Sequence, residues 1–131
     1  MLRYALPALA LFALGAVVGA QTAPLIGDRS TPLRPLGGEG NVGISNAVLR
    51  DQPEVRALRV VVEPGGTRAL HGHADVRFHL FVPLSDAMTL DLEAGPVDVQ
   101  PWHPYFLPGG TRHGFRNTGD DVVELMKIFI R

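Results

Sequence analysis

The chain has 131 residues, 12 lysines and arginines against 13 aspartates and glutamates, a formal net charge of −1, and no cysteine. This length suits one domain with a modest core. The charge balance argues against a nucleic-acid or anionic-membrane partner, and the absence of cysteine excludes disulfides, thiolate zinc sites and a thiol nucleophile. Any metal ion must therefore be held by His, Asp, Glu or backbone oxygen.

Residues 1–20 differ from the rest of the chain. Arg3 precedes the apolar run ALPALALFALGAVV, and the small residues VGA stand before Gln21. This pattern is typical of a signal peptide cleaved after Ala20, although an uncleaved N-terminal anchor is the alternative. We expect a secreted or periplasmic protein with no stable membrane span after cleavage, because the run is short and no stop-transfer pattern follows it. Removal of Arg3 leaves 11 basic and 13 acidic residues, a net charge of −2.

The segment after the signal, residues 21–52, is rich in Pro, Gly and Thr at its start and is expected to form an extended N-terminal arm. Residues 53–131 are expected to form one β-domain. Its strand candidates are, in chain order, VRALRVVV, which EPGG should end, then RALHGH, FHLFVPL, AMTLDL, VDV, PYFL, HGF and VVELMKIFI.

None of these segments has a sustained period of 3.6 residues. Met88, Leu90 and Leu92 instead alternate with polar residues, as in a half-buried strand. The chain also has 15 glycines and 11 prolines, which helix interiors tolerate poorly. Short strands separated by Gly and Pro predict an all-β sandwich or barrel.

The stretch HGHADVRFH, residues 71–79, holds three of the five histidines. On a strand, His71 and His73 point to the same face, so that both imidazoles can bind one ion. The alternative is an exposed His-Gly-His turn. His103 lies between prolines in QPWHPY and is expected on the surface.

A second segment, PGGTRHGFRN at residues 108–117, joins the first in a pattern that resembles the two-part signature of the cupin superfamily. The first cupin motif has the form G-x5-H-x-H-x3–4-E-x6-G, and Gly65, His71 and His73 match its beginning. The second has the form G-x5-P-x-G-x2-H-x3-N, which Pro108, Gly110, His113 and Asn117 match. The resemblance covers roughly residues 53–131. It implies a cupin-type double-stranded β-helix, or jelly-roll barrel, in which His113 joins His71 and His73.

Two positions depart from the cupin pattern. Trp102 stands where the second motif begins with Gly, so the turn there should be built differently. The first-motif glutamate should stand at 77 or 78, which are Arg77 and Phe78, and His79 follows one position later. We expect His79 to take the place of the missing ligand. The alternative follows from strand alternation: if the face of Phe78 and Leu80 points inward, His79 points away from the metal.

The resemblance implies a bound divalent metal ion, which could be Zn, Cu, Ni, Fe or Mn, with open positions for a ligand. Without the carboxylate the ion keeps its full charge, which should favour anionic ligands and suit Zn, Cu or Ni at least as well as Mn. Arg77 is predicted to bind a small-molecule ligand, with Arg112 as a second candidate, and Tyr105 to line the cavity. Asp75 and Glu124 are possible acids or bases. The alternatives are that the arginines and carboxylates are solvated surface charges and that Tyr105 packs in the core.

Three functions are compatible with these features. The first is an exported metalloenzyme acting on a small polar or anionic substrate. The second is a non-catalytic module that binds a metal ion or small ligand, and the third is a metal-free structural barrel, in which the matched histidines would have no reason. A homodimer is also expected, because a barrel this small with a closing strand as apolar as VVELMKIFI exposes apolar strand faces.

Overall fold

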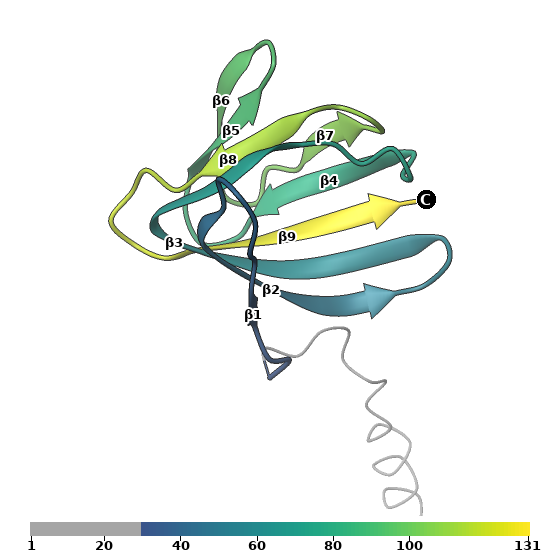
Figure 1. Cartoon of the computed structure of the whole chain (residues 1–131), viewed down its shortest axis with the longest axis horizontal. Coiled ribbons are helices and arrows are strands. Elements are labelled where there is room, and N and C mark those ends of the chain that lie inside the picture. Colours follow the sequence, from purple (N-terminus) through teal and green to yellow (C-terminus); the bar gives the residue numbers. More distant parts are fainter. Residues whose placement is uncertain (1–29) are drawn as a thin grey trace, which may run out of the picture.

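The computed structural model describes residues 30–131, and it is all-β within that range (Figure 1). The strands are β1 (Arg34–Pro35), β2 (Val42–Asp51), β3 (Val55–His71), β4 (Phe78–Pro83), β5 (Met88–Leu92), β6 (Gly95–Val99), β7 (Tyr105–Pro108), β8 (His113–Arg116) and β9 (Val123–Ile130). No helix in this range is long and apolar enough to cross a membrane. The predicted signal peptide and residues 21–29 of the predicted arm lie outside the described residues.

The strands form one antiparallel sheet in the order β6-β5-β8-β3-β9-β4-β7, with β2 paired to β3 and β1 to β2. The sheet curves into a barrel, with β5 and β8 on one side and β4 and β9 on the other (Figure 1). Five strands each place one almost fully buried side chain between these two sides, namely Phe81, Leu90, Leu107, Phe115 and Leu125. The all-β barrel predicted from the short alternating strands is confirmed.

The EPGG sequence does not end a strand, contrary to expectation. β3 continues through it to His71, and there it changes its neighbour from β9 to β8. Gly65 has φ of +74°, and a Cβ on Gly66 would lie 2.7 Å from the carbonyl oxygen of Glu63. The two glycines therefore bend the strand rather than stop it, because only glycine fits both positions. This bend carries β3 from one side of the barrel to the other.

The barrel begins before residue 53. β2, which lies in the predicted arm, pairs with β3 in an antiparallel register that includes Ile44 opposite Val62 and Ala47 opposite Arg59. Ile44 and Ala47 are 4% and 3% exposed. Two irregularities in the register interrupt the period-2 pattern, which is why the alternation is hard to see in the sequence.

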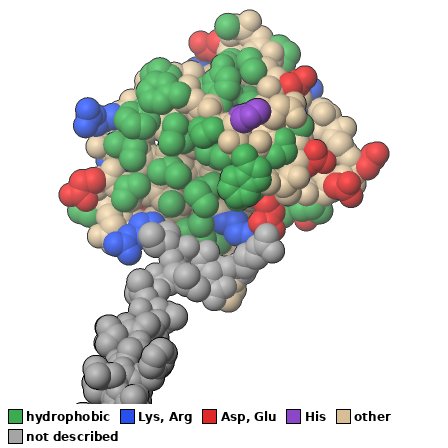
Figure 2. All heavy atoms as spheres, turned by 180° about the vertical axis from the view of Figure 1, so that it is seen from behind, with side chains coloured by type: hydrophobic (Ala, Val, Ile, Leu, Met, Phe, Trp, Pro, Cys, Tyr) green, Lys and Arg blue, Asp and Glu red, His purple; other side chains and the backbone are tan. Residues whose placement is uncertain are grey.

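The two faces of β4 are opposite to what its apolar pattern suggests. His79, Phe81 and Pro83 point into the barrel, whereas Leu80 and Val82 lie half-buried on the outside. β9 alternates in the same way, so its outward residues extend this outer face. Both faces of β4 carry large apolar residues, and the inner one also carries His79, so the face that looks more apolar in the sequence is the outer one. Figure 2 shows the apolar side chains gathered on the outer face.

The turn before β7 has an unusual backbone. Trp102 adopts φ of 64°, and its N–H donates to the carbonyl of Pro83 at 2.9 Å. Its side chain is 72% exposed. The turn thus keeps a conformation that glycine adopts easily, and tryptophan carries a strain of about 1 kcal/mol there.

Candidate metal centre

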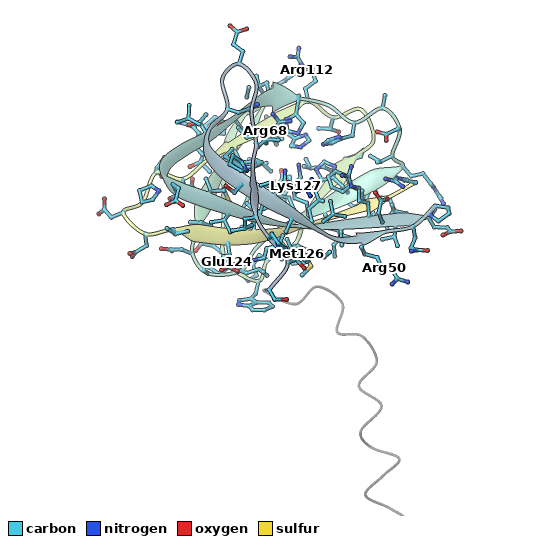
Figure 3. All side chains as sticks on the ribbon, turned by 60° about the horizontal axis from the view of Figure 1, so that its bottom comes forward. Arg50, Arg68, Arg112, Glu124, Met126 and Lys127 are labelled. Atoms are coloured by element: carbon cyan, nitrogen blue, oxygen red, sulfur yellow. The ribbon has the colours of Figure 1, made fainter. Side chains whose placement is uncertain are left out.

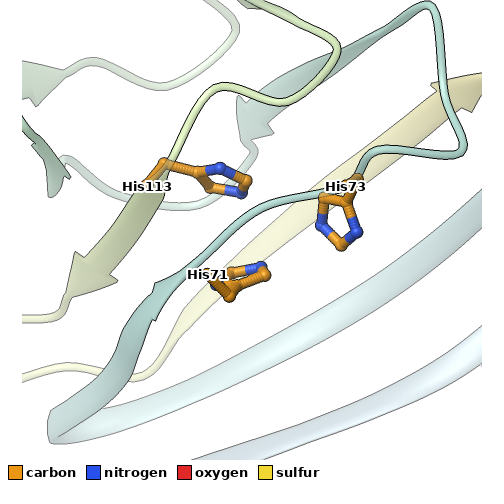
Figure 4. Close-up of side chains that lie close together, drawn as sticks. All are labelled: His71, His73 and His113. Atoms are coloured by element: carbon orange, nitrogen blue, oxygen red, sulfur yellow. The ribbon is translucent and has the colours of Figure 1, made fainter.

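Three of the predicted ligands meet inside the barrel. β3 and β8 pair so that His71 lies opposite His113, and His73 follows in the loop after β3. One ring nitrogen of each residue lies within 4.8 Å of the other two (Figure 4). Nitrogen ligands of one tetrahedral zinc ion lie about 3.4 Å apart, so side-chain rotations that shorten these separations by up to about 1.4 Å bring all three to a common ion.

Hydrogen bonds to the backbone orient two of these rings. Nδ1 of His71 lies 2.9 Å from the carbonyl oxygen of Ala69, and Nδ1 of His113 lies 2.9 Å from that of Thr111. A carbonyl only accepts, so Nδ1 carries the proton in the neutral ring and Nε2 is left with a free lone pair. The Nε2 atoms of His71, His73 and His113 are buried and have no hydrogen-bond partner among the described residues. A metal ion would give all three Nε2 atoms a partner, so these histidines fit the divalent metal ion that the cupin resemblance implies.

His79 lies beside this group. It is 1% exposed, and its ring centre is 4.6 Å from that of His113 and 5.3 Å from that of His73. Both of its ring nitrogens are buried without a partner among the described residues. Its ring also packs on Phe129, with the centres 5.0 Å apart. Because the 4.8 Å group contains only the other three histidines, its role as a fourth ligand stays a prediction.

Burial keeps all four imidazoles neutral at pH 7. Desolvation lowers the pKa of His71 to about 3, of His73 to about 4, of His79 to about 2 and of His113 to about 4. The positive charge of Lys127 lowers each of these pKa values further. A neutral imidazole is the form that binds a metal ion, so no proton must leave these rings before binding.

A cavity of about 240 Å³ adjoins His71 and His73. Four cationic side chains and one carboxylate, that of Asp75, line it together with apolar residues; the cations are those of Arg56, Arg68, Lys127 and Arg131. Asp51 forms ion pairs with Arg56 at 3.6 Å and with Arg131 at 3.0 Å. Within residues 30–131, Arg68 and Lys127 have no such carboxylate, so this part of the chain gives the cavity a net positive charge.

The residues predicted to bind a ligand lie elsewhere. Arg77 is exposed and does not line the cavity, and Tyr105 packs against the hydrophobic core. Arg112 is exposed and lies 3.8 Å from Glu93. Asp75, in the loop after His73, does reach the cavity.

Other sequence expectations concern residues away from the histidines. Glu124 lies on the outer face of β9 and forms an ion pair with Arg59 at 2.9 Å. His103 is exposed, as expected. Sequence reasoning missed Arg68 and Lys127, although the alternation of the last strand places Lys127 on the same face as Phe129 and so signals a buried lysine.

Comparison with known proteins supports the fold described above. No family model and no curated protein sequence matches the chain. Many solved structures match its fold. A predicted oxalate decarboxylase from Thermotoga maritima is 18% identical with a TM-score of 0.73, covering 81% of this chain and 97% of its own. The polyketide cyclase RemF from Streptomyces resistomycificus is 20% identical with a TM-score of 0.68, covering 77% of this chain and 74% of its own.

A cupin domain from Bordetella pertussis is 25% identical with a TM-score of 0.60, over 72% of this chain and 99% of its own. Similarity at this level of identity concerns the fold. The chain therefore has a cupin-type fold, and the predicted jelly-roll barrel is confirmed.

Proposed function

We propose that this chain is an exported cupin that binds a divalent metal ion through His71, His73 and His113, with His79 as a fourth ligand. The bound ion and the adjoining cavity together bind a small polar or anionic molecule. The observation that carries this proposal is that His71, His73 and His113 each hold a buried Nε2 with no hydrogen-bond partner among the described residues, and each offers a ring nitrogen within 4.8 Å of the other two. Buried nitrogens without hydrogen-bond partners cost stability, and a metal ion bound by all three would remove that cost.

The metal ion would supply Lewis-acid chemistry, either by polarising a ligand oxygen or by lowering the pKa of bound water. The four imidazoles carry no negative charge, so they leave the full charge of the ion available to an anionic ligand. An all-nitrogen set favours Zn, Cu or Ni, with Fe and Mn as the remaining candidates. Asp75 is the carboxylate positioned at the cavity to hold or accept a proton.

Elemental analysis of the purified protein tests the metal proposal. We expect about one metal ion per chain in the wild type and less than about one tenth of that in His113→Ala. His103→Ala is the matched control, because it removes an exposed histidine outside the cluster. A wild-type protein that takes up none of the five metals, even after stripping and titration, contradicts the proposal.

The role of His79 needs its own variant. His79→Phe keeps a ring against Phe129 but removes both nitrogens. If His79 is a ligand, zinc affinity falls by about tenfold or more in this variant. Unchanged zinc affinity would assign His79 to packing and leave three histidines as the protein ligands.

Binding alone and catalysis remain two candidate activities. The cavity beside His71 and His73 favours a site that receives a ligand over one that only stores an ion. The fold does not choose a reaction, since a polyketide cyclase and a predicted oxalate decarboxylase share it. Mass spectrometry of candidate ligands after incubation with the metal-loaded protein distinguishes an enzyme, which changes the ligand, from a binding module, which returns it unchanged.

Export is supported by the sequence of residues 1–20. We expect the whole chain, expressed in a Gram-negative host, to be recovered from the periplasm or medium with Gln21 at its N-terminus. Recovery with Met1 in the membrane fraction would identify an uncleaved anchor.

A homodimer is supported by the outer face of β4 and β9. Leu80 lies opposite Ile128 and Val82 opposite Met126, and Phe106 of β7 extends this apolar face at 54% exposure. A face of this kind is typical of a protein–protein interface. Light scattering should give twice the chain mass, and Ile128→Glu should give the monomer.

A further inference from the structure

Lys127 is a buried cation that no role described above uses. β9 alternates strictly, and Lys127 occupies its inward row together with Val123, Leu125 and Phe129. It is 4% exposed. Its neighbours Glu124 and Met126 lie on the opposite face of the strand, as Figure 3 shows. Lysine is among the residues least often buried without a paired charge, so its position calls for a reason.

The ammonium group of Lys127 has no carboxylate or hydrogen-bond acceptor among the described residues. Its Nζ instead lies 5.7 Å from the ring centre of Phe115 and 5.2 Å from that of Phe129. Its strongest charged neighbour is another cation, Arg68, and burial followed by this repulsion lowers the lysine pKa to about 7. The aromatic rings compensate only part of the desolvation.

Arg68 is the second cation of the cavity that forms no ion pair with any described residue. Its guanidinium donates to the amide oxygen of Asn41 at 2.7 Å, which is a neutral partner. Arg68 and Lys127 both line the 240 Å³ cavity, and both point into the space between the two sides of the barrel in Figure 3. An anion between them would convert their mutual repulsion into two attractive contacts.

The lysine is also close to the histidine cluster. The ring of Phe129 lies 4.9 Å from that of His73, so the lysine Nζ is no more than about 10 Å from that imidazole. A metal–oxygen bond is about 2 Å and an ammonium–oxygen hydrogen bond about 2.8 Å. A molecule that binds both the metal ion and the lysine ammonium therefore has its charged oxygens only a few bonds apart.

We propose that Lys127 binds one anionic group of a small ligand whose other anionic group binds the metal ion, so that the site selects small dianions such as short dicarboxylates. Arg68 contributes to the same anionic subsite. This inference rests on the proposed metal function and adds to it the class of ligand and the residue that recognises it. The buried ammonium is retained at a cost in stability because it distinguishes dianions from monoanions and neutral molecules.

The test measures binding rather than turnover. Zinc-loaded protein is titrated calorimetrically with malonate and succinate, and separately with the monomethyl ester of each, which has one carboxylate. The variants are Lys127→Met, which keeps the apolar stem and removes the charge, and Arg77→Met, which removes an exposed cation outside the cavity. Zinc content and far-UV circular dichroism are measured for each, so that loss of metal or fold is recognised.

In the wild type and in Arg77→Met, at least one dicarboxylate should bind about tenfold or more tightly than its monoester, as expected for a charged hydrogen bond in a dry site. In Lys127→Met this preference should vanish while the affinity for the monoester changes less than about twofold. A wild type that binds zinc but shows no preference for either dicarboxylate, or a Lys127→Met protein that keeps the preference, overturns the inference and leaves the metal function intact. A protein that binds no zinc overturns both.

Discussion

Replacing Lys127 by Met should make the metal-free protein more stable at pH 7. The ammonium is almost completely buried, and its pKa falls from an ordinary value of 10.5 to about 7. A pKa lowered by this much corresponds to at most about 5 kcal/mol of destabilisation by the protonated form. An imperfect fit of the methionine side chain in place of the lysine offsets about 1–2 kcal/mol of that. We therefore expect Lys127→Met to raise the free energy of unfolding by about 2–4 kcal/mol.

The pH dependence identifies the cause. The unfolded lysine binds its proton below pH 10.5 and the folded lysine only below about 7, so the wild type gains stability as pH rises through this window. Arg68 and the four histidines face the same cavity, and they are present in both proteins. The stability difference between variant and wild type should thus shrink to less than about 1 kcal/mol near pH 10.5.

Urea unfolding of the two metal-free proteins at pH 7, 8.5 and 10.5, followed by circular dichroism, measures both quantities. Lys127→Met that is less stable than the wild type at pH 7 would refute the reasoning. So would a stability difference that does not change with pH, because packing and not charge would then be its cause.

Three further predictions concern the cluster, the turn and the ligand. The metal-free protein should lose stability as pH falls from about 6.5 towards 4. Burial lowers the pKa values of all four histidines to between about 2 and about 4, so the unfolded chain takes up protons before the folded protein does. A free energy of unfolding in urea that does not change between pH 7 and 5 contradicts this. Trp102→Gly should raise the free energy of unfolding by about 1 kcal/mol, whereas Trp102→Ala should not, because only glycine relieves the left-handed backbone. Arg68→Met should weaken malonate binding to the zinc-loaded protein by about tenfold, and Arg77→Ala should leave it unchanged, as calorimetry can show; equal losses would return Arg77 to the binding site.

The sequence predicted most strands of residues 53–131 and two histidines of the cluster because both signals are local. Alternation of apolar residues and the breaks at Gly and Pro depend on neighbours a few positions apart. The spacing His71-x-His73 places two imidazoles together without any knowledge of the fold. Only the resemblance to cupins brought His113 to them, since pairing between β3 and β8 is a long-range contact that no local pattern specifies.

Other features depended on the closed barrel. β4 carries large apolar residues on both faces, so only its place in the closed barrel determines that His79 points inward. Arg77 lies just before β4 and is exposed, so the alternation of the strand does not bring it to the cavity. Closure of the barrel also places Lys127, which lies on the mostly apolar strand β9, at the cavity. In the EPGG segment, a sequence that usually ends a strand bends one instead. β9 pairs with β3 up to Val62, β8 pairs with it from Thr67, and Asn117 forms backbone hydrogen bonds with Gly65 and Gly66 between them.

By itself the sequence determined the chemistry that is available: imidazoles without thiols, in a chain of short strands. The tertiary structure decided which side of each strand is inside and which charges share one cavity. The physical reason is that a one-residue change in strand register exchanges the two faces of a strand, and register is set by partners distant in the chain.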